Sequence, residues 1–394
     1  MRVLFTTQPG AGHFHPQVPL ARAVAAAGHA VAFACSPAFQ PTVEAAGFRC
    51  FPAGLPWLET ELEAAFPALR ALPPGEWDAY VDAHIFAGAT AEALAHDVLA
   101  LSDRWPPDLI VRDCVEFGGC LAAEALGLPH AIGGFCFFGP PGIEQARFGA
   151  PLAALRAALG LPPDPELRMH QRYLSVVPTV PGLVGPRQAV APVVHFLRPA
   201  PFDQSGAERL PDWVRTLPAR PRVYASLGTI FNHSPGLFAA ILAGLRDEPL
   251  TLILTVGRNQ DPAAFGPQPG NVRIERYVPQ TLLLPHCDLV VTHGGFNTVH
   301  AALCQGLPLV LVPLGADQPL NAAACAAMGV GRVVAAEART PGALRDAVRA
   351  VLADPTYRAS AERVRDEAAA LPGPAYAVAL LERLARDKQP LLAR

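Results

Sequence analysis

Short apolar runs alternate with amphipathic stretches along the chain, and the alternation begins at the N-terminus. In the first half, strand-like runs cover residues 2–7, 30–35, 108–112 and 130–132. Helical patterns lie between them, one expected to begin near Pro16 and end at Gly28 and another over about 116–126. Strands that alternate with helices predict parallel βαβ units.

The same pattern begins again at residue 222, after a stretch whose proline and polar content breaks the periodicity. We therefore predict an N-terminal domain over 1–200, a linker over 201–220 and a C-terminal domain over 221–372. A helix near 375–386, within the last segment 373–394, is expected to pack back on the N-terminal domain. The strands expected in the second half cover 222–226, 250–256, 288–292, 308–312 and 331–335, and its helices cover 341–353 and 357–371. The fold class is α/β, with two Rossmann-like domains.

Length and charge narrow the function classes. A chain of 394 residues is long for one core, so two domains are the natural expectation. The net charge is −3, and no basic run stands out, which argues against nucleic-acid binding. No apolar stretch reads as long enough to span a bilayer, and the N-terminus enters a strand pattern directly. We expect a cytoplasmic protein without stable membrane insertion, as a monomer or homodimer.

The eight cysteines lie mostly in apolar segments and form no Cys-x-x-Cys pair, which disfavours a zinc site. We interpret them as small buried side chains in a reducing compartment.

The segment 292–321 carries the densest chemistry. A strand leads into the turn His293-Gly294-Gly295 and then a helix, and a helix N-terminus after a glycine turn suits an anionic phosphate. The next strand ends at Asp317-Gln318, a pair that can accept from and donate to sugar hydroxyls. Together these features indicate a nucleotide-sugar site. The alternatives are that Asn297 and Thr298 cap a helix and that Asp317 begins a solvated loop.

A second group follows the first and third strands of the N-terminal half. His13 lies in a Gly-rich turn, and a histidine with an ordinary pKa near 6.5 can act as a base near neutral pH. Asp113 also follows a strand and could hold the other imidazole nitrogen. The alternatives are a structural histidine and a turn aspartate. Glu116 is a competitor for the carboxylate role and an expected helix N-terminal acid.

Four segments together resemble a known family. The opening VLFTTQPGAGHFHP, then SLGT, RYVPQ and finally HGGFNTVHAALCQGLPLVLVPLGADQ are similar to family 1 glycosyltransferases with the GT-B fold. The likeness is greatest to bacterial enzymes that glycosylate natural-product aglycones. It spans essentially the whole chain. It implies two facing Rossmann-like domains with parallel sheets and a cleft between them, and transfer with inversion at the anomeric carbon.

The resemblance also implies residue roles. It assigns the base to His13 rather than His15, and its partner to Asp113. The resemblance also implies three groups of donor-binding positions. The diphosphate is bound by Thr229, His293, Gly295, Asn297 and Thr298, the sugar by Asp317 and Gln318, and the nucleobase by Tyr277, Val278 and Gln280. An ordinary strand-end turn is the alternative for Thr229, and a core aromatic is the alternative for Tyr277.

Ala301 bears on the choice of nucleotide. Relatives that use ribonucleotide donors carry a glutamate at the matching position, where it binds the ribose hydroxyls. Alanine removes that acceptor and favours a dTDP-sugar over a UDP-sugar. We expect no cofactor beyond the nucleotide sugar and no metal, because the chain has no Asp-x-Asp motif.

The first domain's loops are rich in aromatic residues, which suits a flat hydrophobic acceptor such as an aromatic or polyketide aglycone. The candidate acceptor residues are Trp57, Phe66, Phe86, Phe135 and Phe138. Burial in the core is the alternative for each of them.

The sequence disfavours three rival functions. A NAD-dependent oxidoreductase would require a third glycine in the turn after the first strand, and this chain has His15 at that position. A nucleotide-sugar 2-epimerase shares the two-domain fold but needs no acceptor. A non-enzymatic partner protein of another transferase would have no need for His13, Asp113 and the pair Asp317-Gln318.

Overall fold

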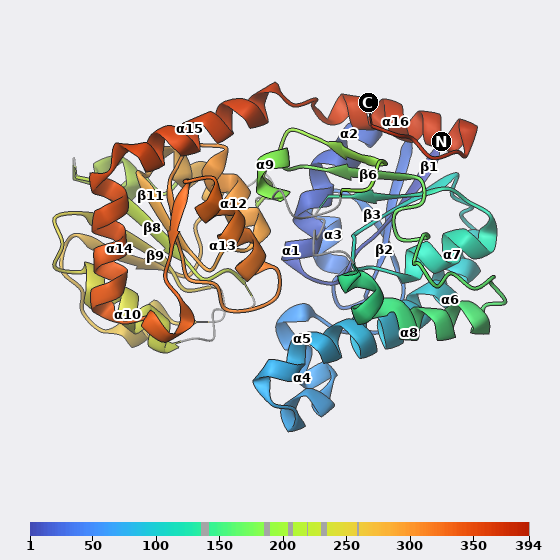
Figure 1. The fold of residues 1–394 in the computed structure, drawn as a ribbon, viewed down its shortest axis with the longest axis horizontal. Helices are drawn as coiled ribbons and strands as arrows, with labels where there is room; N and C mark the ends of the chain where they lie inside the picture. Colours follow the sequence, from blue (N-terminus) through green and yellow to red (C-terminus); the bar gives the residue numbers. More distant parts are fainter. Residues whose placement is uncertain are drawn as a thin grey trace. The chain divides into compact units, whose positions relative to one another are not determined.

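A computed structural model describes residues 1–134, 142–184, 190–203, 208–218, 220–229, 235–257 and 260–393 (Figure 1). The chain divides into two compact units. The first contains Met1–Pro178, Pro186–Arg198 and the C-terminal segment Pro372–Arg394, and the second contains Thr179–Gly185 and Pro199–Leu371.

The first unit is built on a seven-stranded sheet in the order β3-β2-β1-β4-β5-β6-β7. Every neighbouring pair in it is parallel. The strands are β1 (Arg2–Thr6), β2 (Ala30–Cys35), β3 (Arg49–Pro52), β4 (Leu109–Arg112), β5 (His130–Gly133), β6 (Leu174–Val177) and β7 (Val194–Phe196). The direction in which strands are added reverses between β1 and β4, so this pair forms the switch point of a doubly wound sheet.

Helices of the first unit connect these strands. They are α1 (Ala11–Phe14), α2 (Val18–Ala26), α3 (Gln40–Ala45), α4 (Leu62–Ala65), α5 (Trp77–Tyr80), α6 (Thr90–Ser102), α7 (Gly118–Leu126), α8 (Ile143–Ala158) and α16 (Pro374–Asp387), with 3-10 turns at η1 (His15–Gln17), η2 (Glu59–Glu61), η3 (Pro67–Ala71) and η4 (Pro74–Glu76) and a π-helix η5 (Val81–Ala89).

The first helix differs from the prediction. It was expected to begin near Pro16, but helical structure already begins at Ala11 in α1 and passes through η1 into α2. Each proline stands at the first or second position of its element, where a missing N–H costs nothing. The left-handed Gly28 (φ +86°) follows the end of α2, close to the expected stop.

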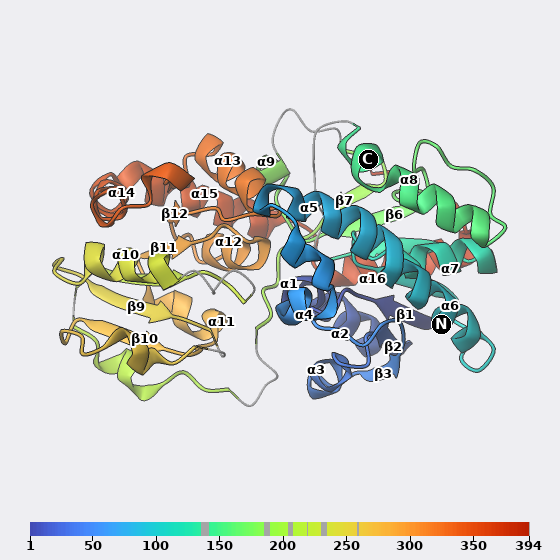
Figure 2. The same cartoon turned by 90° about the horizontal axis from the view of Figure 1, so that it is seen from below.

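The segment Trp77–Ser102 corrects a second expectation. Within the described residues it is the one helical run long and apolar enough, by length and composition, to cross a membrane. Half of its most apolar window is buried inside the structure. The middle of this run, η5, lies beside α8 (Figure 2), and α6 packs on α7 through buried Leu94, Val98 and Leu101. Its hydrophobicity thus serves packing within the unit.

The C-terminal helix α16 lies along α2 of the same unit (Figure 1). Its buried residues, including Ala377, Leu381 and Leu384, recur at helical spacing and form one apolar face. The chain after the helix is held by the backbone N–H of Leu391, which donates to the carbonyl oxygen of Tyr173 at 2.8 Å. The end of the chain is therefore part of the first unit.

The second unit contains a six-stranded parallel sheet in the order β10-β9-β8-β11-β12-β13. Its strands are β8 (Arg222–Ser226), β9 (Thr251–Thr255), β10 (Val272–Glu275), β11 (Leu289–Thr292), β12 (Leu309–Leu311) and β13 (Gly331–Val333). Its helices are α9 (Pro181–Val184), α10 (Pro235–Leu245), α11 (Gln280–Leu283), α12 (Phe296–Leu303), α13 (Gln318–Ala327), α14 (Pro341–Ala353) and α15 (Pro355–Ala370), with 3-10 turns at η6 (Asp212–Thr216), η8 (Pro262–Phe265), η9 (Leu284–His286) and η10 (Ala336–Ala338).

Alternation along the strands decides which helices cover which face of this sheet. On β8, Val223 and Ala225 join a core cluster with α10 and α14. Tyr224 points the other way and joins a cluster with α12, α13 and α15. Successive side chains of a strand point to opposite faces, so these nearly continuous apolar strands are buried on both sides.

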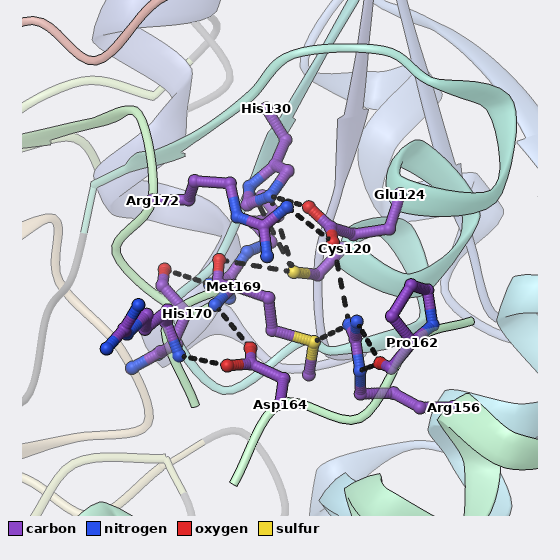
Figure 3. A network of polar contacts seen from close by, with 11 residues as sticks. Cys120, Glu124, His130, Arg156, Pro162, Asp164, Met169, His170 and Arg172 are labelled. Carbon is purple, nitrogen blue, oxygen red and sulfur yellow. Dashed lines mark hydrogen bonds and ion pairs between the residues drawn. The ribbon is translucent and has the colours of Figure 1, made fainter. Parts of the chain in front are cut away.

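A buried polar network supports the first unit behind β4 and β5 (Figure 3). His130 on β5 lies 3.5 Å from Glu124 of α7 and 3.7 Å from the sulfur of Cys120. The Glu124 carboxylate also pairs with Arg156 of α8 at 3.5 Å and with Arg172 at 2.9 Å. These contacts tie α7, β5 and α8 to the segment 162–172.

Arg112 links this network to the end of β4. Its side chain is fully buried, and its guanidinium donates to the carbonyl oxygens of Asp113, Cys114 and Glu116 at 3.0 to 3.2 Å and of His170 at 2.6 Å. A buried cation stabilises only when such partners replace its lost hydration. Arg112 therefore organises the loop that follows β4.

Replacing Arg112 with methionine should lower the free energy of unfolding by about 3 kcal/mol, because several buried carbonyl groups lose their donor. Urea denaturation followed by circular dichroism measures this. The matched control is Arg104→Met, since Arg104 is exposed in the same unit. Equal stability of the two variants would contradict the role given to Arg112.

Candidate functional site

The candidate base lies at the switch point of the first sheet. Thr6 at the end of β1 is paired with Arg112 at the end of β4. The loops after these strands therefore leave the same edge of the sheet, side by side. One loop carries His13 and the other carries Asp113.

His13 and Asp113 are in direct contact. The imidazole Nδ1 lies 2.5 Å from Oδ2 of Asp113, and the aspartate side chain is 1% exposed. The other carboxylate oxygen, Oδ1, accepts from the backbone N–H of Val115 at 3.0 Å, and the backbone N–H of Asp113 donates to Thr6 at 3.1 Å. A histidine held at one nitrogen by a carboxylate can act as a general base through the other.

The charges around His13 determine its protonation. Burial lowers its pKa, but the charges of Asp113 and then Glu59 raise it, and the result lies well above the ordinary value of histidine. For Asp113, burial raises the pKa, while the charge and hydrogen bond of His13 lower it, with a net lowering. Both shifts favour an imidazolium paired with a carboxylate.

Two residues beside His13 were not identified as its neighbours from the sequence. Nε2 of His13 lies 3.4 Å from Oε1 of Glu59, a residue of η2. The Phe86 ring of η5 meets the imidazole edge-on, with ring centroids 5.9 Å apart. Phe86 was predicted only as an acceptor-binding residue. No periodicity or motif marks Glu59, because it lies in a 3-10 turn of only three residues.

Glu116 does not compete with Asp113 for His13. Both of its carboxylate oxygens accept from the backbone N–H of Gly119 at 3.0 Å, and Thr6 donates its hydroxyl to the same group. Burial raises the pKa of Glu116, although the Thr6 and Gly119 hydrogen bonds lower it. Glu116 holds the start of α7, as expected for a helix N-terminal acid.

Three of the predicted acceptor residues share one cluster. Trp57 is buried and meets Phe66 in a T-shaped contact at 5.3 Å, and Phe86 belongs to the same cluster. Of the three, Phe86 contacts His13. Phe135 and Phe138 lie outside the described residues.

The candidate donor site lies at the corresponding place in the second sheet. Ser226 at the end of β8 is paired with Thr292 at the end of β11, and Thr292 is paired with Leu311 on β12. The loops that carry Thr229, His293 and Asp317 therefore leave one edge of this sheet. Thr229 is exposed there.

His293 is packed into the turn by glycines. A Cβ at Gly228 would lie 2.7 Å from the His293 ring, and one at Gly295 would lie 2.5 Å from Nε2. Both glycines therefore make room for the imidazole itself. Burial lowers the pKa of His293 to about 4, although a hydrogen bond to the Ser226 backbone raises it. His293 is therefore neutral near pH 7.

The helix α12 begins directly after the glycine turn. Its N-cap is Gly295, which has no side chain, so Asn297 and Thr298 occupy the first turn rather than the cap position. The alternative interpretation of these two residues as caps is wrong. Thr298 is buried and Asn297 is half-buried.

Asp317 and Gln318 have different surroundings. Oε1 of Gln318 accepts from the backbone N–H groups of Leu314 and Gly315 at 2.7 and 3.2 Å, and the residue is buried. Asp317 is half-buried and accepts from the side chain of Asn321 at 2.6 Å.

Asn321 is a residue that the sequence analysis missed. Its amide also donates to the carbonyl oxygen of Gly294 at 2.9 Å, which links the glycine turn to Asp317. The available signal was its position one helical turn after Asp317, on the same face of α13.

The segment predicted to hold the nucleobase is fixed by Asp203, a residue of the predicted linker that belongs to the second unit. The Tyr277 hydroxyl donates to the carbonyl oxygen of Asp203, whose carboxylate accepts from Thr281 at 2.6 and 2.9 Å. Tyr277 and Gln280 are half-buried, whereas the Val278 side chain lies in the core, so only its backbone is left for a ligand. Ala301 is 4% exposed and belongs to the same core cluster.

Among the residues that the structure describes, no group of three or more His, Cys, Asp or Glu side chains is arranged to hold a metal ion. The described cysteines are free thiols, and all but the half-buried Cys304 are buried.

Comparison with known proteins extends these observations. Residues 240–384 match the family model of the erythromycin biosynthesis protein CIII-like C-terminal domain. The chain is 31% identical to 4'-demethylrebeccamycin synthase from Lentzea aerocolonigenes, over 97% of this chain and 99% of that protein. It is 33% identical to tylactone mycaminosyltransferase from Streptomyces fradiae, over 98% of this chain and 92% of that protein.

Solved structures agree with the sequence comparisons. The crystal structure of the glycosyltransferase VinC in complex with dTDP superposes with a TM-score of 0.78 and 29% identity, covering 98% of this chain and all of the other. These three proteins match 97% or 98% of this chain, so the similarity extends over both units. The chain therefore belongs to the natural-product glycosyltransferases of the GT-B fold.

Proposed function

We propose that this glycosyltransferase moves a sugar from a dTDP-sugar to a hydrophobic aromatic or polyketide acceptor, with inversion at the anomeric carbon. The contact between His13 and Asp113 carries the proposal. Asp113 orients the imidazole, and neutral His13 takes the acceptor proton through Nε2 as the acceptor oxygen attacks the anomeric carbon. The bond from that carbon to the diphosphate breaks, and the diphosphate leaves.

The second unit would stabilise the diphosphate through neutral groups. The N-terminus of α12 offers backbone N–H groups and the positive end of a helix dipole. His293 is uncharged near pH 7, so it would act as a hydrogen-bond donor rather than as a cation. Asp317 and the amide nitrogen of Gln318 are proposed to bind sugar hydroxyls.

Ala301 supports the choice of a deoxyribonucleotide. Its methyl group is packed in the core and offers no acceptor to a ribose hydroxyl. The similar glycosyltransferase VinC was crystallised with dTDP, in line with this choice. The acceptor class follows from relatives whose names refer to rebeccamycin and tylactone and from the aromatic cluster that includes Phe86.

The variant His13→Ala should lower turnover by roughly 100-fold or more while dTDP binding is preserved, because only the general base is lost. Turnover with a panel of aromatic and polyketide aglycones and titration with dTDP measure the two properties. His15→Ala is the matched control, since it removes a neighbouring half-buried histidine. Normal turnover of the His13 variant would refute the proposed base.

The variant His293→Ala should weaken dTDP binding, because the diphosphate loses a buried donor and the glycine turn loses the ring that fills it. Isothermal titration calorimetry with dTDP measures the change. His286→Ala removes a half-buried histidine from η9, before β11, and serves as the control. Unchanged affinity of the His293 variant would remove the diphosphate role.

Wild-type protein should bind dTDP more tightly than UDP, with EDTA present in both titrations. The physical reason is that Ala301 offers the ribose 2'-hydroxyl no acceptor, so that hydroxyl would be desolvated without a partner. Calorimetry with both nucleotides tests this. Tighter binding of UDP would overturn the donor assignment, and binding that requires a divalent ion would contradict metal independence.

A further inference from the structure

Glu59 occupies the side of His13 on which the reaction would take place. Its carboxylate Oε1 lies 3.4 Å from Nε2 of His13, and the Glu59 side chain is 17% exposed. The backbone N–H of Glu59 donates to the carbonyl oxygen of Pro9 at 3.1 Å, which fixes η2 beside the loop after β1. Its other oxygen, Oε2, is buried and has no hydrogen-bond partner among the described residues.

Gly10 makes this position of the carboxylate possible. A Cβ built on Gly10 would lie 1.7 Å from Oε2 and 2.8 Å from Cδ of Glu59. The backbone of Gly10 is extended, at φ −143° and ψ 148°, so alanine can adopt it without strain. The glycine is needed here for space and not for its conformational freedom. An alanine would displace the end of a flexible side chain.

The position of Glu59 matters because only one nitrogen of the His13 ring is available to an acceptor hydroxyl. Nδ1 is held by Asp113 at 2.5 Å, so an acceptor hydroxyl must reach Nε2, where Glu59 lies. The charged groups that act on the ring are Asp113 from the loop after β4 and Glu59 from η2, and η5 contributes the uncharged Phe86. Arg112 and Glu116 interact with Asp113: the Arg112 charge lowers the pKa of Asp113, and the Asp113 charge raises the pKa of Glu116.

We propose that Glu59 is a positioning residue that holds His13 protonated in the resting site and sets the pH at which the imidazole becomes available as a base. Two carboxylates, one at each nitrogen, stabilise the imidazolium more than Asp113 alone. The inference deepens the proposed function, since it rests on His13 being the base.

His13 must lose a proton before it can act as the base. The Nε2–H bond of the imidazolium breaks, its electron pair stays on the nitrogen, and the proton passes to solvent water or buffer. The acceptor hydroxyl then takes the place of Glu59 as the hydrogen-bond partner of Nε2. In the transfer itself Nε2 receives the acceptor proton and His13 returns to its charged form, which Glu59 stabilises again.

The test is an NMR titration of the histidine ring signals in the full-length protein. The His13 signal is assigned by its loss in His13→Ala. In Glu59→Gln, which keeps the shape and removes the charge, the His13 ring should titrate at lower pH than in wild type. In Gly10→Ala, which keeps the carboxylate but displaces it, the titration should move in the same direction.

Glu61→Gln is the matched control, because Glu61 belongs to the same 3-10 turn and is exposed. Its His13 titration should equal that of wild type. An unchanged titration in Glu59→Gln or in Gly10→Ala, with the far-UV circular dichroism of wild type, would overturn the proposal. So would a shift in Glu61→Gln equal to that of Glu59→Gln, because the effect would then be general charge.

The NMR titration and the activity assay test two different claims. Full activity in His13→Ala would refute the base role in the proposed function, while the NMR result would still decide whether Glu59 controls the charge of His13. With an aglycone that supports turnover, the acid limb of kcat/KM should move to lower pH in Glu59→Gln together with the NMR titration. An acid limb that stays at the wild-type pH would overturn the link to the reaction.

Discussion

The parallel pairing of β1 with β4 is the constraint on which the first unit's chemistry depends. These two strands are far apart in the sequence, yet Thr6 and Arg112 are partners at their carboxyl ends. Because the order of strands reverses here, neither connection crosses the space above the pair. His13 and Asp113 can therefore meet at 2.5 Å, and Arg112 holds the loop that carries the aspartate.

The second unit repeats this arrangement with β8 and β11, but its histidine, His293, is uncharged near pH 7. Burial lowers the pKa of both His13 and His293. At His13 two carboxylates outweigh burial, whereas His293 has uncharged partners such as Thr292 and the Ser226 backbone. The two histidines therefore differ in charge, because carboxylates surround only one of them.

Small residues determine where these side chains fit. Gly228 and Gly295 leave space for the His293 ring, and Gly10 leaves space for the Glu59 carboxylate. In each case a Cβ would collide with the imidazole ring or the carboxylate, and Gly228 also has a left-handed backbone (φ +77°). Polar residues then lock the loops, as Asn321 does between Gly294 and Asp317 and as Asp203 does at Tyr277 and Thr281.

The sequence by itself determined the α/β class, most strands of the second unit to within one or two residues, and the loops that carry His13, Asp113 and His293. Apolar runs, glycine turns and a shared motif are local signals, and they can be read from neighbouring residues without knowledge of the tertiary structure. Only the tertiary structure decided that Glu59 faces Nε2 of His13 and that Asp203 and Asn321 hold the loops after β10 and β11. These features depend on contacts between distant segments, for which a single sequence holds no periodic signal.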